Sequence, residues 1–265
     1  SRRAAAGDAA RLDARARAPR DVAAEATAPL AAGAGCAFAL VADGHGGQEA
    51  SRHAARRFPE LLAEKLDSRD GRSSSLEAAL RYAWLRCAEE FDKDGPGGAV
   101  AVAACVDVDA QALALLHCGD SRCVAVRAGR PAAAFATSDH TLADPRERGA
   151  LENRGGSAQG GRVVAENWRV AVPRALGGSA WRRAKISPAP DVDVLDLGDA
   201  DALVLASDGL WDALSSDDAA SFVNARRLFR PSDDAVAVAR SLADRAAALG
   251  STDDISVAVV FLDRG

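Results

Sequence analysis

The sequence predicts an α+β fold in which antiparallel sheets are covered by helices. Apolar residues recur three and four positions apart over 48–66 and 73–91, which is typical of amphipathic helices. The period then changes, and short apolar runs separated by turns follow over 99–136, as in an antiparallel meander. Strands and helices are therefore grouped rather than strictly alternating, which favours an α+β arrangement.

The first half of the chain is expected to supply one strand, two helices and the meander. The run 36–42 is apolar throughout and is typical of a buried strand. The helix over 73–91 can be capped at its start by Ser74 or Ser75. The expected elements are a strand over 36–42, helices over 48–66 and 73–91, and strands over 99–108, 112–117, 123–127 and 132–136.

The second half is expected to supply further strands and the helices that cover them. Between the halves, the glycine-rich stretch 155–178 is expected to be an excursion made of loops. The expected elements are a short polar helix over 145–154, strands over 192–197, 202–206 and 255–262, and helices over 215–225 and 231–249. No internal repeat or linker is visible, so we expect a loosely ordered leader over 1–20 and one domain over 21–265.

Composition limits the classes of partner. The 265 residues are 48% hydrophobic and carry a net charge of −5 without a basic tract, so we expect neither nucleic acid nor membrane as a partner. Five cysteines without a CxxC pair indicate a reduced protein without zinc. We expect an intracellular monomer, cytoplasmic or nuclear. Methionine is absent even at position 1, so we expect a trimmed domain from which any targeting segment has been removed.

The most informative feature is an aspartate that ends an apolar run. The run ending at Ala42 is followed by Asp43, Gly44 and His45, which places a carboxylate, a bare backbone and an imidazole at a sheet edge. Alone, Asp-Gly is also an ordinary turn. The same device recurs at Asp208, and Asp253 directly precedes the last apolar run.

Three aspartates at strand ends suit hard divalent cations. Mg²⁺ and Mn²⁺ prefer oxygen ligands, and a hydrolytic two-metal centre needs carboxylates that bridge or terminate the two ions. Asp43, Asp208 and Asp253 are far apart in the sequence, but strand ends of adjacent sheets can converge. The alternative is three separate turn residues, which explains one of them well and all three poorly.

Five motifs occur in an order that resembles the metal-dependent protein serine/threonine phosphatases, the protein phosphatase 2C or PPM family. They are DGHGG at 43–47, GDSR at 119–122, RALGG at 174–178, SDGLWD at 207–212 and DDIS at 253–256. The resemblance covers about residues 35 to 262. It implies a four-layer α-β-β-α sandwich of two antiparallel sheets flanked by helices.

The resemblance also implies metal ligands. Asp43 corresponds to the carboxylate that bridges two Mg²⁺ or Mn²⁺ ions, and Gly44 would offer its backbone carbonyl. The implied terminal ligands of one ion are Asp208 and Asp253. A weaker third ion is implied at Asp120 and Asp212, although Asp120 also fits a simple hairpin turn.

His45 has two interpretations. It can be a turn histidine bonded to neighbouring backbone, or a general acid that protonates the leaving seryl or threonyl oxygen. The family position favours the acid. The other histidines, His53, His117 and His140, lack such a setting, and we expect them to be structural.

The resemblance weakens near the N-terminus. The family usually has an arginine, three residues, and then Glu-Asp, in which the arginine grips the phosphate. Here Arg17 and Asp21 keep the spacing from Arg to Glu, so Arg17 is the expected phosphate ligand and Asp21 an expected metal ligand. Arg15 and Arg20 remain alternatives for the phosphate. A further departure is Gly178, where the family usually has Asp.

The resemblance implies a Mg²⁺/Mn²⁺-dependent protein serine/threonine phosphatase. Its substrates would be phosphoproteins, and a hydroxide bridging the metals would attack phosphorus directly, without a phosphoenzyme. The alternative is a catalytically weak pseudophosphatase that binds phosphoproteins or acts as a scaffold, which the altered first motif supports. A two-metal nuclease is disfavoured because the sequence has no basic groove.

Overall fold

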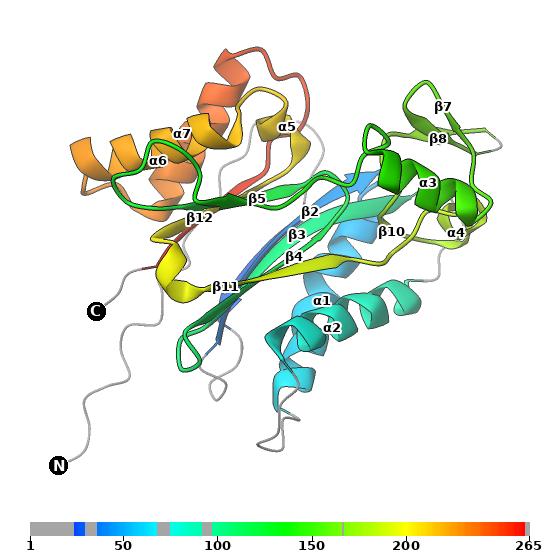
Figure 1. Ribbon diagram of the computed structural model, residues 1–265, viewed down its shortest axis with the longest axis horizontal. Helices are drawn as coiled ribbons and strands as arrows, with labels where there is room; N and C mark the ends of the chain where they lie inside the picture. The colour runs from blue at the N-terminus through cyan, green and yellow to red at the C-terminus, as the bar shows by residue number, and fades with distance from the viewer. Residues whose placement is uncertain (1–23, 30–35, 68–74, 92–96, 166, 263–265) are drawn as a thin grey trace.

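The computed structural model describes residues 24–29, 36–67, 75–91, 97–165 and 167–262, with side chains from residue 36 onward. Two antiparallel sheets pack face to face and carry helices on their outer faces (Figure 1). A smaller unit lies beside one end of this sandwich. The predicted α-β-β-α arrangement is therefore confirmed.

The larger sheet contains the strand that leads into the candidate site. Its strand order is β1-β2-β3-β4-β11, with β10 also paired to β3, and every pairing is antiparallel. The strands are β1 (Ala24–Pro29), β2 (Cys36–His45), β3 (Gly98–Asp107), β4 (Ala112–Cys118), β10 (Leu176–Gly177) and β11 (Asp191–Asp196).

Strand β2 is apolar on both faces because both faces are covered. Phe38 and Leu40 belong to the cluster beneath helices α1 (Glu49–Asp67) and α2 (Leu76–Glu90), whereas Ala39 and Val41 face the second sheet. This explains why the run 36–42 shows no polar alternation. Helix α2 is anchored further by Trp84, whose Nε1 donates a hydrogen bond to the Pro188 carbonyl at 2.8 Å.

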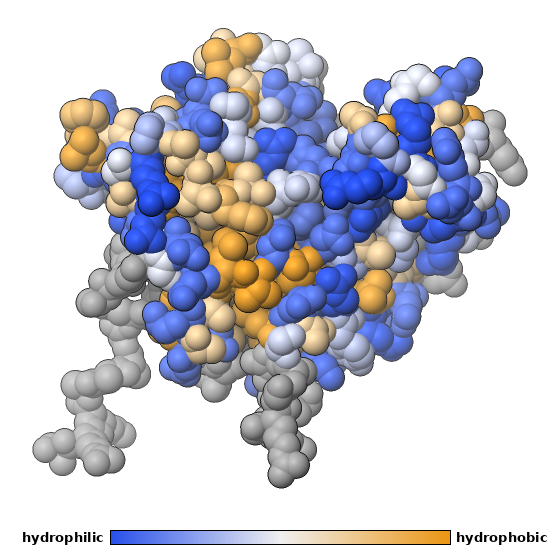
Figure 2. Space-filling model, viewed as in Figure 1, coloured by the Kyte–Doolittle hydropathy of each residue, from blue (hydrophilic) through white to orange (hydrophobic). Residues whose placement is uncertain are grey.

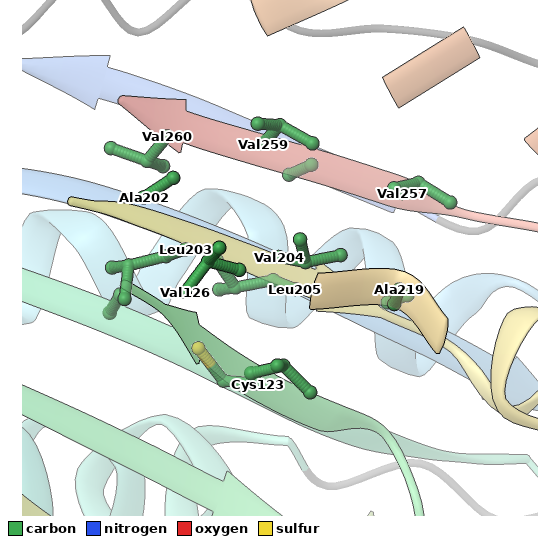
Figure 3. Packing of buried hydrophobic residues seen from close by; sticks show 14 of the residues in the cluster. Cys123, Val126, Ala202, Leu203, Val204, Leu205, Ala219, Val257, Val259 and Val260 are labelled. Atoms are coloured by element: carbon green, nitrogen blue, oxygen red, sulfur yellow. The ribbon is translucent and has the colours of Figure 1, made fainter. Parts of the chain in front are cut away.

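The second sheet has the strand order β13-β12-β5-β6. Its strands are β5 (Arg122–Val126), β6 (Phe135–Ala136), β12 (Ala202–Ala206) and β13 (Val257–Phe261), and its outer face carries α6 (Ser216–Phe229) and α7 (Ala235–Ala248). Figure 3 shows the valine and leucine side chains of β12 and β13 packed with Cys123 and Val126 of β5. Burying these branched side chains on both faces makes this sheet rigid.

The smaller unit is formed by the chain between the two sheets. It contains α3 (Pro145–Asn153), the three-stranded sheet β7 (Ala158–Gln159), β8 (Arg162–Val164) and β9 (Arg169–Val170), and α4 (Ser179–Arg183). Its own core gathers around Leu151, Val163 and Trp181. The remaining short elements are the 3-10 turn η1 (Leu197–Asp199) and α5 (Asp208–Trp211).

The structure differs from the sequence-based expectations where tertiary contacts determine the ends of an element or the presence of a short one. Strand β2 continues past Asp43 to His45 because His45 pairs with Gly98. The stretch 155–178 is not only loop, since it holds β7 to β10. Helix α4 also escaped prediction, and its N-cap residue Gly178 supplies no side-chain cap.

Three further features concern the cysteines, the helices and the N-terminal leader. The five cysteines are free and buried. None of the helices in the described part of the chain is both long and apolar enough to cross a bilayer. The leader predicted over 1–20 lies outside the described residues, so this prediction stays untested.

Candidate active site

A pocket of about 400 Å³ lies where the two sheets and the smaller unit meet. In Figure 2 the surface is hollowed between the part that carries α5 and the part that carries β7 and β8, and mainly hydrophilic residues line the hollow on this face. The lining residues are Asp43, Gly44, His45, Gly46, Asp120, Arg162, Trp168, Arg169, Val170, Ala171, Trp181, Asp208, Asp253 and Asp254.

Three of these lining residues, Asp43, Gly44 and His45, form the end of β2. Pairing with β3 up to Gly98 holds Asp43 and His45 in extended backbone, so they have fixed positions on a rigid sheet. Between them, a Cβ on Gly44 would lie 2.8 Å from the Gly47 carbonyl and 2.8 Å from the Ser51 hydroxyl. Only glycine allows this tight turn from strand into α1.

Asp208 and Asp253 come together because two loops are hydrogen-bonded to each other. The hydroxyl of Ser207 donates to the Asp254 carbonyl at 3.1 Å and accepts from the Ser256 N–H at 3.1 Å. Ser207 N–H also donates to the Ser256 carbonyl. The start of α5 and the segment before β13 therefore form one unit that positions both carboxylates.

Gly209 is the tightest point of this unit, and Gly209→Ala tests it. The new Cβ would lie 2.3 Å from the Asp254 carbonyl oxygen, so the loop carrying Asp253 must shift. We expect a loss of about 1–3 kcal/mol in unfolding free energy and weaker cation binding, measured by chemical denaturation and calorimetry. The matched control is Gly149→Ala, because Gly149 is helical with open space around its Cβ position, so a gain of up to about 1 kcal/mol is expected. Unchanged stability and cation affinity in Gly209→Ala would contradict the role given to this contact.

The carboxylates raise one another's pKa. Burial, followed by the charges of Asp208, Asp253 and Asp254, raises the pKa of Asp43 to about 7. Burial and the charge of Asp208 raise the pKa of Asp120 to about 7, against the opposing effect of His45. The pKa of Asp208 is also raised, first by burial and then by Asp253. Without a counter-charge, the cluster therefore favours protonation.

The same groups fit hard divalent cations. The Oδ1 atoms of Asp120 and Asp208 are shielded from solvent and find no hydrogen-bond donor among the described residues. Buried carboxylate oxygens without donors are costly unless a cation binds them. An all-oxygen donor set of this kind suits Mg²⁺ or Mn²⁺.

His45 lies beside an aromatic wall. Its ring meets Trp181 edge-on, with centroids 6.3 Å apart, and Trp181 stacks on Trp168 at 5.3 Å. Trp181 also packs so closely over two glycines that a Cβ on Gly98 or Gly177 would lie 2.5 or 2.4 Å from its ring. The imidazole therefore has one aromatic neighbour, and it shares the pocket with Asp120 and Asp208, whose pKa values it influences.

The structure brings together six of the residues predicted from the sequence. They are Asp43, Gly44, His45, Asp120, Asp208 and Asp253. Asp212 is the exposed C-cap of α5 and is not part of the pocket lining, although its charge raises the pKa of Asp208. Arg17, Asp21 and the alternatives Arg15 and Arg20 lie outside the described residues.

Sequence reasoning assigned no site role to several lining residues. Asp254 adjoins Asp253 in the sequence, so its acidity was a visible signal. No sequence signal marked the other four, because their positions depend on how β8, β9 and α4 fold over the end of the larger sheet. They are Arg162, Trp168, Arg169 and Trp181.

A second group of polar side chains lies behind the turn that carries Asp120. Potential ligand atoms of His117, His140 and Asp191 lie within 4.8 Å of one another. His140 Nδ1 accepts a hydrogen bond from the Gly119 N–H at 3.2 Å, so the neutral ring carries its proton on Nε2, which lies 3.1 Å from Asp191 Oδ2.

This tautomer argues against a cation at the second group. A metal at Nε2 of His140 would move the proton to Nδ1, against the Gly119 N–H. Burial lowers the pKa of His140 to about 4, which keeps the ring neutral. The backbone N–H of His140 also donates a hydrogen bond to the Gly119 carbonyl. We therefore interpret His140 as structural support for Gly119, the residue before Asp120.

The comparisons with known proteins agree with this geometry. A sequence model of the family described as Protein phosphatase 2C matches residues 34–255, which include the whole carboxylate floor of the pocket. The chain belongs to the protein phosphatase 2C family. The fold, the ordered motifs and the acidic pocket of this family member are thus consistent with one another.

Individual relatives support the same assignment. Probable protein phosphatase 1N of Mus musculus is 37% identical over 239 residues, covering 85% of this chain and 57% of that protein. Probable protein phosphatase 2C 32 of Oryza sativa subsp. japonica is 36% identical over 237 residues, covering 86% and 58%. A solved structure described as a C. elegans sex determining protein superimposes with a TM-score of 0.76 at 29% identity, covering 86% of this chain and 57% of that one. The chain thus spans less than two thirds of the length of each of these proteins.

Proposed function

We propose that this protein phosphatase 2C family member hydrolyses phosphoserine and phosphothreonine in proteins, with Mg²⁺ or Mn²⁺ as cofactor. The observation that carries the proposal is the cluster of carboxylates around Asp43, in which buried oxygens of Asp120 and Asp208 find no hydrogen-bond donor among the described residues. At neutral pH such a cluster destabilises the folded protein unless protons or cations offset its charge. The names of the relatives and of the family support the phosphatase assignment.

The residues have distinct proposed roles toward the cations. Asp43 would contact two ions, Gly44 would offer its carbonyl, and Asp208 and Asp253 would bind one ion. Asp120 would contribute to a weaker third site, and Asp212 would join it only by reaching in from the end of α5. When bound, the cations would lower the pKa of water and offset the charge of the phosphate.

The remaining roles belong to groups that contact the substrate. Asp21 would support a cation from the N-terminal segment, and Arg17 would hold the phosphate through its guanidinium fork. His45 would give a proton to the leaving oxygen, since it is half-buried and lies beside the carboxylates without a competing side-chain partner among the described residues. Trp181 would keep that imidazole oriented.

The direct test of this function is hydrolysis of a phosphothreonine peptide by the wild-type protein with Mn²⁺, with Mg²⁺ and with EDTA. We expect turnover with either cation and none above background with EDTA. Turnover that survives EDTA would contradict the proposal. Peptide binding without turnover in the presence of either cation would favour a phosphoprotein-binding pseudophosphatase instead.

Leaving-group dependence tests the role of His45. A serine or threonine alkoxide is a poor leaving group and needs a proton, whereas p-nitrophenolate leaves without one. We expect His45→Gln to lower kcat on a phosphothreonine peptide by about 100-fold or more, and on p-nitrophenyl phosphate by much less. An equal loss on both substrates would argue that His45 positions the site rather than donating a proton. His53→Gln serves as the control histidine, because His53 lies against Phe91 on the α1–α2 side.

A further inference from the structure

We propose that the rim of the pocket binds acidic side chains that flank the phosphorylated residue, so that acidic phosphopeptides are the preferred substrate class. This inference rests on the proposed phosphatase function and adds a second recognition site to it. The rim consists of Arg162, Arg169 and Trp168, all of which line the pocket. They lie on β8, on β9 and directly before β9.

Pairing between the strands places both arginines on one face of the small sheet. Val163 pairs with Val170, and these two side chains are buried in the core of the smaller unit. Residues on either side of them must point the opposite way because side chains alternate along a strand. Arg162 and Arg169 are accordingly exposed, and they share the outer face of the sheet.

Among the described residues, Arg162 and Arg169 have no carboxylate partner, unlike two other arginines, Arg122 and Arg174. Arg122 is paired with Asp139 at 2.6 Å, and Arg174 with Glu147 at 2.5 Å, so neither is available to a ligand. Within the described residues, Arg162 forms no ion pair, and Arg169 makes one long hydrogen bond of 3.4 Å to Gln159 Oε1. In the described part of the chain, the rim of the pocket thus carries two arginines without an ion-pair partner.

Charge is segregated between the rim and the floor. The floor holds Asp43, Asp120, Asp208, Asp253 and Asp254, which would bind cations and, through them, the phosphate. A peptide carboxylate near the phosphate would be repelled by these aspartates but attracted by the rim arginines. The arginine fork matches a carboxylate geometrically.

The tryptophan gives the rim a flat apolar surface beside the arginines. Trp168 is only partly buried and stacks on Trp181, with an interplanar angle of 29°. The stack holds Trp168 in one orientation, and the exposed part of its side chain lines the pocket, where aliphatic groups of a peptide could contact it. The combination of two arginines and an aromatic surface therefore fits an extended peptide that carries carboxylates.

The test uses three phosphothreonine peptides that differ only in their flanking residues, which are aspartate, asparagine or lysine. With Mn²⁺, we expect wild-type kcat/KM to be about fivefold higher for the aspartate peptide than for the asparagine peptide, and lowest for the lysine peptide. The preference should shrink at 0.5 M salt because exposed charges are screened. Equal kcat/KM for all three peptides would overturn the inference.

Substitutions of the rim arginines test whether the rim causes the preference for the aspartate peptide. We expect Arg162→Ala combined with Arg169→Ala to bring the aspartate-to-asparagine ratio close to one. The control, Arg230→Ala combined with Arg240→Ala, removes the same charge from exposed positions at the end of α6 and on α7 and should keep the ratio. If the rim variant instead lowers p-nitrophenyl phosphate turnover as much as turnover of the aspartate peptide, the arginines hold the phosphate itself and the inference is wrong.

A measurement of peptide binding tests this inference separately from the proposed function, because binding does not require turnover. The same peptides are titrated into the Mn²⁺-loaded wild-type and variant proteins by fluorescence anisotropy. Tighter binding of the aspartate peptide that depends on the rim arginines would support acidic recognition even in a protein without turnover. Equal affinities beside normal p-nitrophenyl phosphate turnover would refute the inference and leave the phosphatase function standing.

Discussion

Replacing Asp43 or Asp208 with asparagine is expected to abolish metal-dependent hydrolysis. Each substitution keeps the shape of the side chain but removes a charge from the centre of the acidic cluster. Losing several kcal/mol of charge stabilisation corresponds to a fall in kcat/KM of about 1,000-fold or more. The same variants should bind Mn²⁺ more weakly in calorimetric titrations, and Asp43→Asn should have the larger effect because Asp43 lies among three other aspartates.

The control for both variants is Asp244→Asn. Asp244 is exposed on α7, away from the pocket, and its substitution changes the net charge by the same amount. We expect wild-type kcat/KM and Mn²⁺ affinity in this protein. Full activity of either cluster variant, measured with the wild-type cation concentration, would contradict the assignment of the cluster as the catalytic centre.

The second large effect concerns stability: we expect Mn²⁺ to reverse which of the wild type and the Asp43→Asn variant is the more stable. In the metal-free protein, the pKa of Asp43 and the pKa of Asp120 are both about 7, against an ordinary value of 3.8. Between these pH values the folded state retains protons that the unfolded state has released. These two carboxyls should therefore lower the unfolding free energy of the metal-free protein as pH rises from about 4 to about 7, whereas the lowered pKa of His140 acts in the opposite direction.

Asp43→Asn isolates this effect. At pH 4 the carboxyl of Asp43 is neutral in the folded state, so variant and wild type should have nearly equal stability. At pH 8 in EDTA, the variant should be more stable by about 2 kcal/mol, because the asparagine does not repel the remaining carboxylates. Adding Mn²⁺ should reverse the order, since the cation stabilises the wild type more.

Urea denaturation at both pH values, with EDTA and with Mn²⁺, measures all four states. Asp244→Asn should follow the wild type in each. A stability difference between Asp43→Asn and wild type that is independent of pH and of Mn²⁺ would show that the carboxylates do not form a coupled cation site.

The acidic floor of the pocket could be predicted because its aspartates lie next to apolar runs, a signal that is visible in the local sequence. Asp43 and Asp208 follow apolar runs and Asp253 lies just before one, and the packing of the two sheets brings these strand ends together. Burial on both faces also explains why β2 and β12 were visible as unbroken apolar stretches. The grouping of strands and helices predicted the α+β class, and the layer order was implied by the family resemblance.

The rim could not be predicted because it depends on contacts between distant segments. Trp181 occupies its place only because Gly98 and Gly177 leave room for its ring. The strands that carry Arg162 and Arg169 are two or three residues long, too short for a periodic signal.

The resemblance alone could not show where Asp212 lies relative to the pocket. Asp212 follows Asp208 by four residues, but the single turn of α5 leaves it exposed at the helix end. For the same reason of tertiary context, His117 and His140 stack at 4.8 Å despite lying 23 positions apart in different segments.

Diffraction from a crystal soaked in Mn²⁺, recorded at a wavelength where manganese scatters anomalously, tests the central claim most directly. We expect two anomalous peaks in the pocket about 4 Å apart, both contacted by Asp43 and one also by Asp208 and Asp253. Ions bound at His117, His140 and Asp191 instead, or a pocket in which Asp43 contacts no ion at saturating Mn²⁺, would contradict it.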